Sequence, residues 1–157
     1  MDDVTVARAL HILAVIHWMG GVGFVTAVIL PAVTSIADPS GRLALFEIIE
    51  SRFAAQVKVS VPVAGLTGAY MAERLDAWGR FVEPAGWWLA AMAIIWFLFM
   101  AILFVVEPLV LRGWFQRRAI DDPDGTFRLI QRAHWGLLAA GAATATAAVL
   151  GAHGLLY

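Results

Sequence analysis

Four histidines carry the clearest chemical potential in this sequence, and all of them lie in strongly apolar surroundings. His11 and His17 belong to the run HILAVIHW, and His134 and His153 lie near the two ends of the last apolar stretch. A neutral imidazole nitrogen binds transition metals, and the same ring gains or loses a proton near neutral pH. The pattern therefore predicts a site for a metal, a metal-containing cofactor or a proton inside an apolar environment.

Composition identifies this environment as a lipid bilayer. The chain is 61% hydrophobic and 15% charged, and its mean hydropathy is +0.79, values typical of membrane proteins. A net charge of −1 gives no indication of nucleic-acid binding. The absence of cysteine excludes disulfides, iron–sulfur clusters and thiolate metal sites. The first apolar run is too long for a signal peptide, so it is expected to be part of the structure.

Four segments are long enough to cross the hydrocarbon layer as helices, which takes about 20 apolar residues. Within a single domain over residues 1–157, the helices are expected at about 5–36, 44–74, 86–112 and 126–156. Turn residues at 38–41 and 121–125 (DPSG and DDPDG) separate the first helix from the second and the third from the fourth. Short connections make neighbouring helices antiparallel. The predicted fold class is an all-α membrane protein, a four-transmembrane-helix antiparallel bundle.

Arginines are divided unevenly between the two ends of this bundle. The end with the two turns holds seven, namely Arg42, Arg52, Arg112, Arg117, Arg118, Arg128 and Arg132. The opposite end holds three, namely Arg8, Arg74 and Arg80. Since arginine-rich connections stay in the cytoplasm, both termini are expected in the periplasm of a bacterial-type inner (plasma) membrane. Tryptophans mark the outer and inner interfaces: Trp78, Trp87 and Trp88 on one side, Trp114 and Trp135 on the other.

His11 and His153 lie at matching depth in this arrangement. With helix mid-points near positions 21 and 145, antiparallel packing pairs residues whose numbers add up to about 166, and these two add up to 164. Two facing imidazoles in a membrane bundle can bind the iron of haem b axially. His11 and His153 are therefore the predicted metal ligands. Glycines and alanines on both helices leave room for a porphyrin, although small residues also serve close helix packing without a cofactor.

The other two histidines fall outside this pair. His17 lies about 120° around the helix from His11, so one flat porphyrin cannot use both as equivalent ligands. We expect His17 to line a cavity, bind a second cofactor or carry a proton. His134 has no histidine opposite it on the first helix. It is either a ligand of a second site or an interfacial residue beside Trp135.

Ionisable side chains form a second group in the half of the bilayer expected to be cytoplasmic. Glu107 precedes Pro108 in the third helix, and Arg52 and Lys58 lie in the second helix. Charges at such depths are costly and usually paired. Arg52 and Glu107 are expected at similar depth and are predicted to pair, while Lys58 extends toward the interface.

The first two helices resemble a known family. RALHILAVIHWMGG (Arg8–Gly21) is similar to the first helix of HemJ, the membrane protoporphyrinogen oxidase, and of the related CopD-like membrane proteins. FEIIESRF (Phe46–Phe53), followed by a proline and a glycine, is similar to their second helix, so the similarity covers about 70 residues. The resemblance implies a four-helix membrane protein with b-type haem. His11 then matches the haem-associated histidine and Arg52 the arginine of the family.

The third helix departs from the HemJ pattern. GWWLAAMAIIW (Gly86–Trp96) lacks the histidine and lysine with which the HemJ helix begins, and the fourth helix instead contains His134 and ends in AHG. The departure concerns protoporphyrinogen IX oxidation rather than the haem-binding scaffold. A copper role is implied by the CopD-like proteins, but the four methionines of the apolar segments show no M-x-x-M or M-x-x-x-M pattern.

Three functional hypotheses follow. The first is a b-type haem protein for electron transfer or oxidase chemistry, in which Arg8, Arg74 or Arg80 neutralises the haem propionates. Its partners would be the lipid bilayer and either a redox protein or a quinone, and a homo-oligomer is compatible with the pattern. The second is HemJ-type protoporphyrinogen IX oxidase, and the third is a CopD-like copper permease or a non-catalytic membrane subunit. No catalytic residue is assigned.

Overall fold

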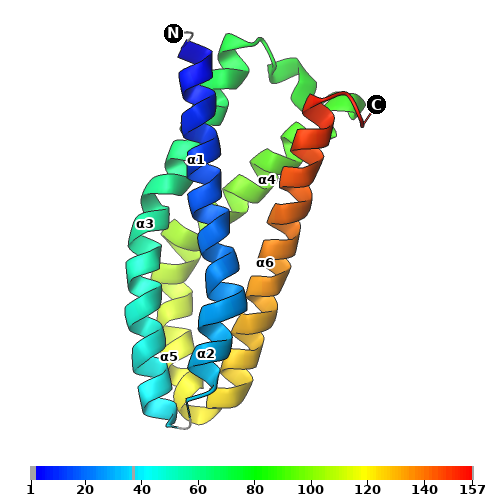
Figure 1. Cartoon of the computed structure of the whole chain (residues 1–157). Helices are drawn as coiled ribbons and strands as arrows, with labels where there is room; N and C mark the ends of the chain where they lie inside the picture. The colour runs from blue at the N-terminus through cyan, green and yellow to red at the C-terminus, as the bar shows by residue number, and fades with distance from the viewer. Residues whose placement is uncertain (1–2, 37, 157) are drawn as a thin grey trace.

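The computed structural model describes residues 3–36 and 38–156, which are mainly helical and include no strand (Figure 1). Met1, Asp2, Ala37 and Tyr157, at the edges of the predicted domain and in its first turn, lie outside the described residues. The first helical segment is nearly continuous and comprises α1 (Asp3–Phe24), η1 (Val25–Ile29) and α2 (Leu30–Thr34). The second segment is the 36-residue α3 (Pro39–Arg74).

The second half of the chain also forms two long helical segments, preceded by two short helices. Short helices η2 (Trp78–Phe81) and η3 (Pro84–Gly86) lead into a long segment of α4 (Trp87–Ala101), η4 (Ile102–Leu111) and α5 (Arg112–Asp121). The last segment is α6 (Pro123–Ala152). Most of the region expected as a loop after residue 112 is therefore helical, and the break between α5 and α6 is confined to Asp122.

Successive long segments run in opposite directions (Figure 1). The start of α1 and the end of α6 lie at one end of the molecule, together with the connection from α3 to α4. We call this the terminal end. The opposite end, the turn end, holds the connections at residues 35–38 and at Asp122. Contacts join α1 to α3 and α6, and α4 to α3 and α6.

Both connections at the turn end use the same local chemistry, the sequence D-P-x-G. Asp38 accepts hydrogen bonds from the backbone N–H groups of Ser40 and Gly41, and Asp122 accepts one from Gly125. Each aspartate caps a helix whose first residue is a proline, a position where the missing N–H costs nothing. The bonds from Gly41 and Ser40 hold the pKa of Asp38 below its usual range.

Prolines explain where the first segment changes its winding. Leu30 donates its backbone N–H to Val25, a π-helical bond, and Pro31 has no N–H to offer. The carbonyl of Thr26 is thereby left without a partner in its own helix. The side-chain amide of Gln131 in α6 donates to this carbonyl at 2.7 Å. This hydrogen bond therefore connects α6 to the π-helical turn η1 of the first segment.

Among the described residues, three helical stretches are long and apolar enough to cross a membrane: Asp3–Thr34, Pro84–Leu111 and Pro123–Ala152. The α3 helix is as long but more polar, since Gln56, Lys58 and Ser60 interrupt its middle. All three of these side chains bond to neighbouring helices. The structure thus supports a multi-pass membrane protein, whereas a fourth crossing by α3 stays a prediction.

Two hydrophobic clusters hold the helices together. The first joins Trp18 and Val22 of α1 to Val57 and Val61 of α3 and Phe99 of α4, and the Trp18 and Phe99 rings meet edge to face at 4.6 Å. The second lies nearer the turn end and is built from Val25, Leu30, Val33, Phe46 and Phe127. The first cluster fixes α1 against α3, the pair of helices that positions the first two histidines, and the second packs η1 and α2 against α3 and α6.

Candidate functional site

The His11 ring lies between α1 and α3. Its Nδ1 atom is 2.8 Å from the Ala64 carbonyl oxygen and 3.3 Å from Thr67 Oγ1. Gly68 makes room for the ring, since a Cβ atom at that position would lie 3.3 Å from His11 Cε1. Because a carbonyl oxygen only accepts hydrogen bonds, Nδ1 carries the proton and donates a hydrogen bond to the Ala64 carbonyl. Nε2 of the neutral ring then keeps its lone pair, and no hydrogen bond from a described residue reaches it.

This arrangement is the one that metal-binding histidines use. Such a histidine donates its second ring N–H to a carbonyl or carboxylate, which fixes the tautomer and the ring orientation. His11 has the required donor contact and the required free Nε2 lone pair. The described geometry has the features that a metal ligand needs, and the role of His11 as a ligand stays a prediction.

His17 has a different environment. Its Nδ1 lies 3.2 Å from Ser60 Oγ, and its Nε2 lies 3.3 Å from Gln56 Oε1. Both ring nitrogens are thus engaged by α3, and neither is free to bind a metal without losing a hydrogen bond. His11 and His17 thus both contact α3, and the expected rotation of His17 away from the ligand plane of His11 stays a prediction.

His134 and His153 each bond to their own helix. The Nδ1 atom of His134 is 3.0 Å from the Ile130 carbonyl oxygen, and that of His153 is 2.8 Å from the Val149 carbonyl oxygen. Both rings therefore carry the proton on Nδ1 and present Nε2, as His11 does. His134 is half-buried in α6, whereas His153 is exposed at the C-cap of α6.

The described residues include no contact between His11 and His153. Helices α1 and α6 come close where Gly141 faces Met19 and Gly23 faces Leu138, so facing residues have numbers that add up to 160 or 161. His11 is then level with position 149 or 150, and His153 lies three to four residues farther toward the terminal end, roughly 5 to 6 Å along the axis. Their joint binding of one iron stays a prediction.

Of the glycines expected on the first and last helices to give room to a porphyrin, three are packed tightly against neighbouring side chains, and so is Gly65 of α3. Phe53 fits against Gly21, Trp96 against Gly65, Met19 against Gly141 and Trp88 against Gly151. A Cβ atom at any of these four positions would collide with that side chain. These glycines serve close helix packing, as small residues do in membrane proteins. Gly20 differs, since nothing lies within 4 Å of an added Cβ.

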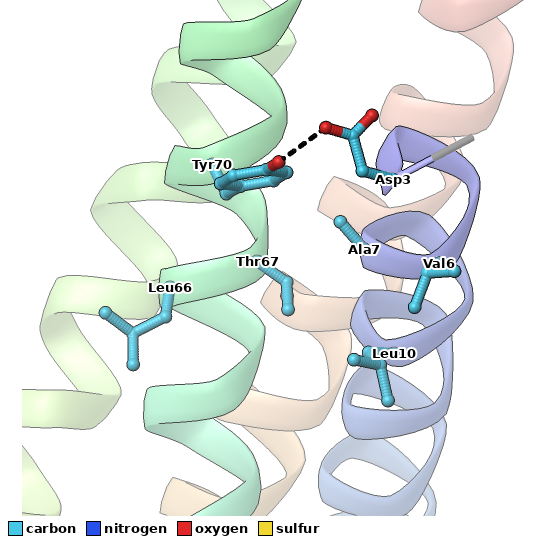
Figure 2. A pocket seen from close by; sticks show the side chains of 7 residues that line it. All are labelled: Asp3, Val6, Ala7, Leu10, Leu66, Thr67 and Tyr70. Carbon is cyan, nitrogen blue, oxygen red and sulfur yellow. Dashed lines mark hydrogen bonds between the residues drawn. The ribbon is translucent and has the colours of Figure 1, made fainter. Parts of the chain in front are cut away.

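A groove of about 410 Å³ lies between α1 and α3 on the terminal side of His11 (Figure 2). Its walls are mainly apolar and include Val6, Leu10 and Leu66. Thr67 lines the groove and also contacts the His11 ring. Asp3 and Tyr70 meet across the groove through a 2.8 Å hydrogen bond. His11 therefore contacts one of the residues that line this groove.

The three arginines at the terminal end differ in their contacts. Arg74 forms a 2.9 Å ion pair with Asp3, and the Arg80 guanidinium lies 5.6 Å from the centre of the Trp88 ring. Arg8, one helical turn before His11, is exposed and forms no ion pair with a described residue. Of the three candidates for neutralising a propionate, Arg8 is thus the one that remains free.

The predicted pair of Arg52 and Glu107 is wrong. Glu107 Oε2 instead lies 3.2 Å from Lys58 Nζ. Lys58 shares a face of α3 with Val61 and Gly65, which both meet Trp96 of α4. Arg52 is six residues before Lys58, which rotates it by about 120° away from that face.

Arg52 is also distant from His11. Contacts between α1 and α3 join residues whose numbers add up to between 73 and 78, as in His17 with Gln56 and His11 with Thr67. Arg52 is therefore level with positions 21 to 26 of the first segment, at least ten residues or about 15 Å along the axis from His11. The structure therefore separates His11 and Arg52, the two residues that the resemblance matched to functional positions of the family.

Two buried tryptophan nitrogens were not anticipated from the sequence. Trp18 Nε1 and Trp88 Nε1 have no hydrogen-bond partner among the described residues. Trp18 lies seven residues after His11, hence on the same face of α1. Both N–H groups are therefore free to donate a hydrogen bond to a polar group that enters the bundle. Such a bond would remove the cost of an unpaired buried donor.

Side chains alone do not form a metal site. Within residues 3–36 and 38–156, no group of three or more histidine, cysteine, aspartate or glutamate side chains is placed to hold a metal ion. Haem imposes a smaller demand, because the porphyrin supplies four nitrogen ligands and the protein only one or two axial ones.

Comparison of the chain with protein-family models, curated proteins and solved structures finds no match.

Proposed function

We propose that this chain is an integral membrane protein that binds haem b through His11 and takes part in electron transfer or oxidase chemistry. The observation that carries the proposal is the hydrogen bond from His11 Nδ1–H to Ala64, which leaves Nε2 as a free ligand nitrogen on a ring that contacts Thr67, a residue of the apolar groove. Haem would supply a one-electron redox centre. The protein would supply the axial nitrogen, a dry environment and the charge of Arg8 for a propionate.

The second axial ligand in this proposal is His153. Its Nδ1–H is bonded to Val149, so its Nε2 is free in the same way. The offset of about one helical turn between the two histidines distinguishes two forms of the site. If α6 adjusts when haem binds, His11 and His153 would both hold the group. If it does not, His11 would hold it alone.

The proposal includes four crossings of a bacterial-type inner membrane, with the terminal end in the periplasm. Arginines gather at the turn end, which favours the cytoplasm, and the polar side chains of α3 are paired with neighbouring helices, which permits its burial in the bilayer. A quinone or a redox protein would exchange electrons with the haem. The bare-copper alternative receives less support, since no cluster of ligands is described.

The test is an absorption spectrum of the protein expressed with ample haem and purified in a mild detergent. We expect a red protein with the reduced α-band of a b-type cytochrome. The His11→Ala variant should lose haem, whereas His17→Ala, the matched control one and a half turns along the same helix, should retain it. A six-coordinate spectrum that becomes five-coordinate and binds carbon monoxide in His153→Ala would identify His153 as the second ligand.

Two outcomes would contradict the proposal. A colourless wild-type protein would remove the haem hypothesis and favour a permease. Loss of haem in His17→Ala with retention in His11→Ala would show that the tautomer argument selects the wrong histidine.

A further inference from the structure

A cavity of about 400 Å³ lies at the turn end, away from His11, His17 and His153. Its lining includes Arg42 from the first turn of α3 and Arg128 and Arg132 from the start of α6. Asp124 is the one carboxylate among its lining residues, and Phe127 is the buried apolar side chain of its wall. Three guanidinium groups therefore surround one carboxylate.

Arg42 is a fixed part of this cavity. Its side chain is 9% exposed and pairs with Asp124. Its Nε and Nη2 donate to the Ile36 carbonyl at 3.2 and 2.8 Å, and its guanidinium carbon lies 5.8 Å from the centre of the Phe127 ring. The charges of Arg42 and Asp124 thus balance each other, and the ion pair between them joins the two D-P-x-G turns.

Arg128 and Arg132 supply charge that this pair does not balance. Both are exposed, and neither forms an ion pair with another described residue. Being four residues apart on α6, they share a face, where two like charges destabilise a helix. An anion bound in the cavity would remove this repulsion and would meet two unpaired guanidinium groups, which bind phosphate oxygens in a bidentate manner.

The position of the cavity indicates which anion reaches it. Trp135, three residues after Arg132, is 50% exposed and lies where the polar start of α6 passes into its apolar part. Tryptophans are enriched at the boundary between acyl chains and headgroups. Arg128 and Arg132 lie beyond Trp135 toward the turn end, hence at headgroup level. A basic cavity between membrane helices at this level is typical of sites for anionic lipid headgroups.

We propose that the cavity bounded by Arg42, Arg128 and Arg132 binds the phosphodiester headgroup of an anionic phospholipid. Arg128 and Arg132 hold the phosphate oxygens, and Arg42 keeps Asp124 neutralised so that the carboxylate does not repel the ligand. The bound lipid bridges the starts of α3 and α6. The site is separate from His11 and does not depend on haem binding.

Binding can be measured with the full chain in a neutral detergent, with phosphatidylglycerol as the probe and phosphatidylcholine as the uncharged reference. We expect phosphatidylglycerol to bind and to raise the unfolding temperature, and phosphatidylcholine to do neither. The Arg128→Gln/Arg132→Gln variant should bind phosphatidylglycerol roughly thirtyfold more weakly, from about 1 kcal/mol for each lost charge. Arg128→Lys/Arg132→Lys keeps both charges and should retain most of the affinity.

The matched control is Arg117→Gln/Arg118→Gln, which removes two positive charges at the same end but on α5, outside the cavity. This control should bind within about twofold of the wild type. An equal loss in both double variants would overturn the proposal, because it would indicate attraction to the whole surface rather than to the cavity. Equal stabilisation by inorganic phosphate at the same concentration would identify a free anion as the ligand and would also overturn it.

Discussion

The ammonium nitrogen of Lys58 lies 3.2 Å from a carboxylate oxygen of Glu107. The pair connects the middle of α3 to the π-helical η4, one residue before Pro108. Both residues lie well inside helices of membrane-crossing length. In the proposed four-crossing arrangement, each charge depends on the other for compensation, since lipid offers none.

Removing one member of this pair should destabilise the protein far more than removing both. Lys58→Met or Glu107→Gln leaves a single group with no opposite charge at this depth, and we expect a several-fold loss of folded protein in detergent. The double variant should recover most of that loss. Size-exclusion chromatography of the four proteins provides the measurement, with Arg52→Gln as the control that should change little. Losses that simply add would mean that the two side chains act independently.

Gln131 provides a second test of helix association. Gln131→Leu should leave the Thr26 carbonyl without a partner, because Leu30 bonds to Val25 and Pro31 has no N–H. An unpaired buried carbonyl costs about 1 to 3 kcal/mol, and thermal unfolding in detergent should show a loss of this size. The control is Gln116→Leu, which removes an exposed amide bonded to Glu47. Equal effects of the two variants would show that the bond to Thr26 contributes nothing specific.

The coarse fold could be predicted from composition and length, because long apolar helices follow from the demands of the bilayer. The two D-P-x-G turns were also readable, although α5 and α6 extend far closer to Asp122 than polarity suggested. Arg117 and Arg118 looked like loop residues, yet a solvated helix accepts them equally well. Polarity alone therefore placed the helix ends wrongly.

The partners of the polar side chains could not be predicted in the same way. Depth matching assigned Glu107 to Arg52, but depth says nothing about which face of α3 meets η4. Similarly, the assumed mid-points placed His11 level with His153, whereas the contact of Met19 with Gly141 shifts the register by several residues. Face and register depend on the shapes of packed side chains such as Trp96 and Phe53, which a hydropathy pattern does not record.

Gly65 should be intolerant of any side chain. A Cβ atom there would collide with the Trp96 indole, whose Nε1–H donates to the Val61 carbonyl at 2.8 Å. Gly65→Ala should therefore force the ring out and destabilise the protein by about 1 to 3 kcal/mol, the usual cost of overpacking. Gly20→Ala is the matched control, because that position is open and alanine favours a helix. Thermal unfolding should separate the two variants, and equal stability would show that the indole is not held in place.

Reporter fusions distinguish four crossings from three. If α3 crosses the bilayer, fusions after Gly79 and after Leu156 should show periplasmic reporter activity and a fusion after Asp121 should be cytoplasmic. If only Asp3–Thr34, Pro84–Leu111 and Pro123–Ala152 cross, and the start of α1 stays outside, the three results reverse: Gly79 and Leu156 become cytoplasmic and Asp121 periplasmic. Alkaline phosphatase is active only in the periplasm, and the second reporter, a fluorescent protein, folds only in the cytoplasm. At each site, therefore, one of the two reporters should be active and the other inactive. We expect the four-crossing pattern, because Gln56, Lys58 and Ser60 are paired with neighbouring helices rather than with water.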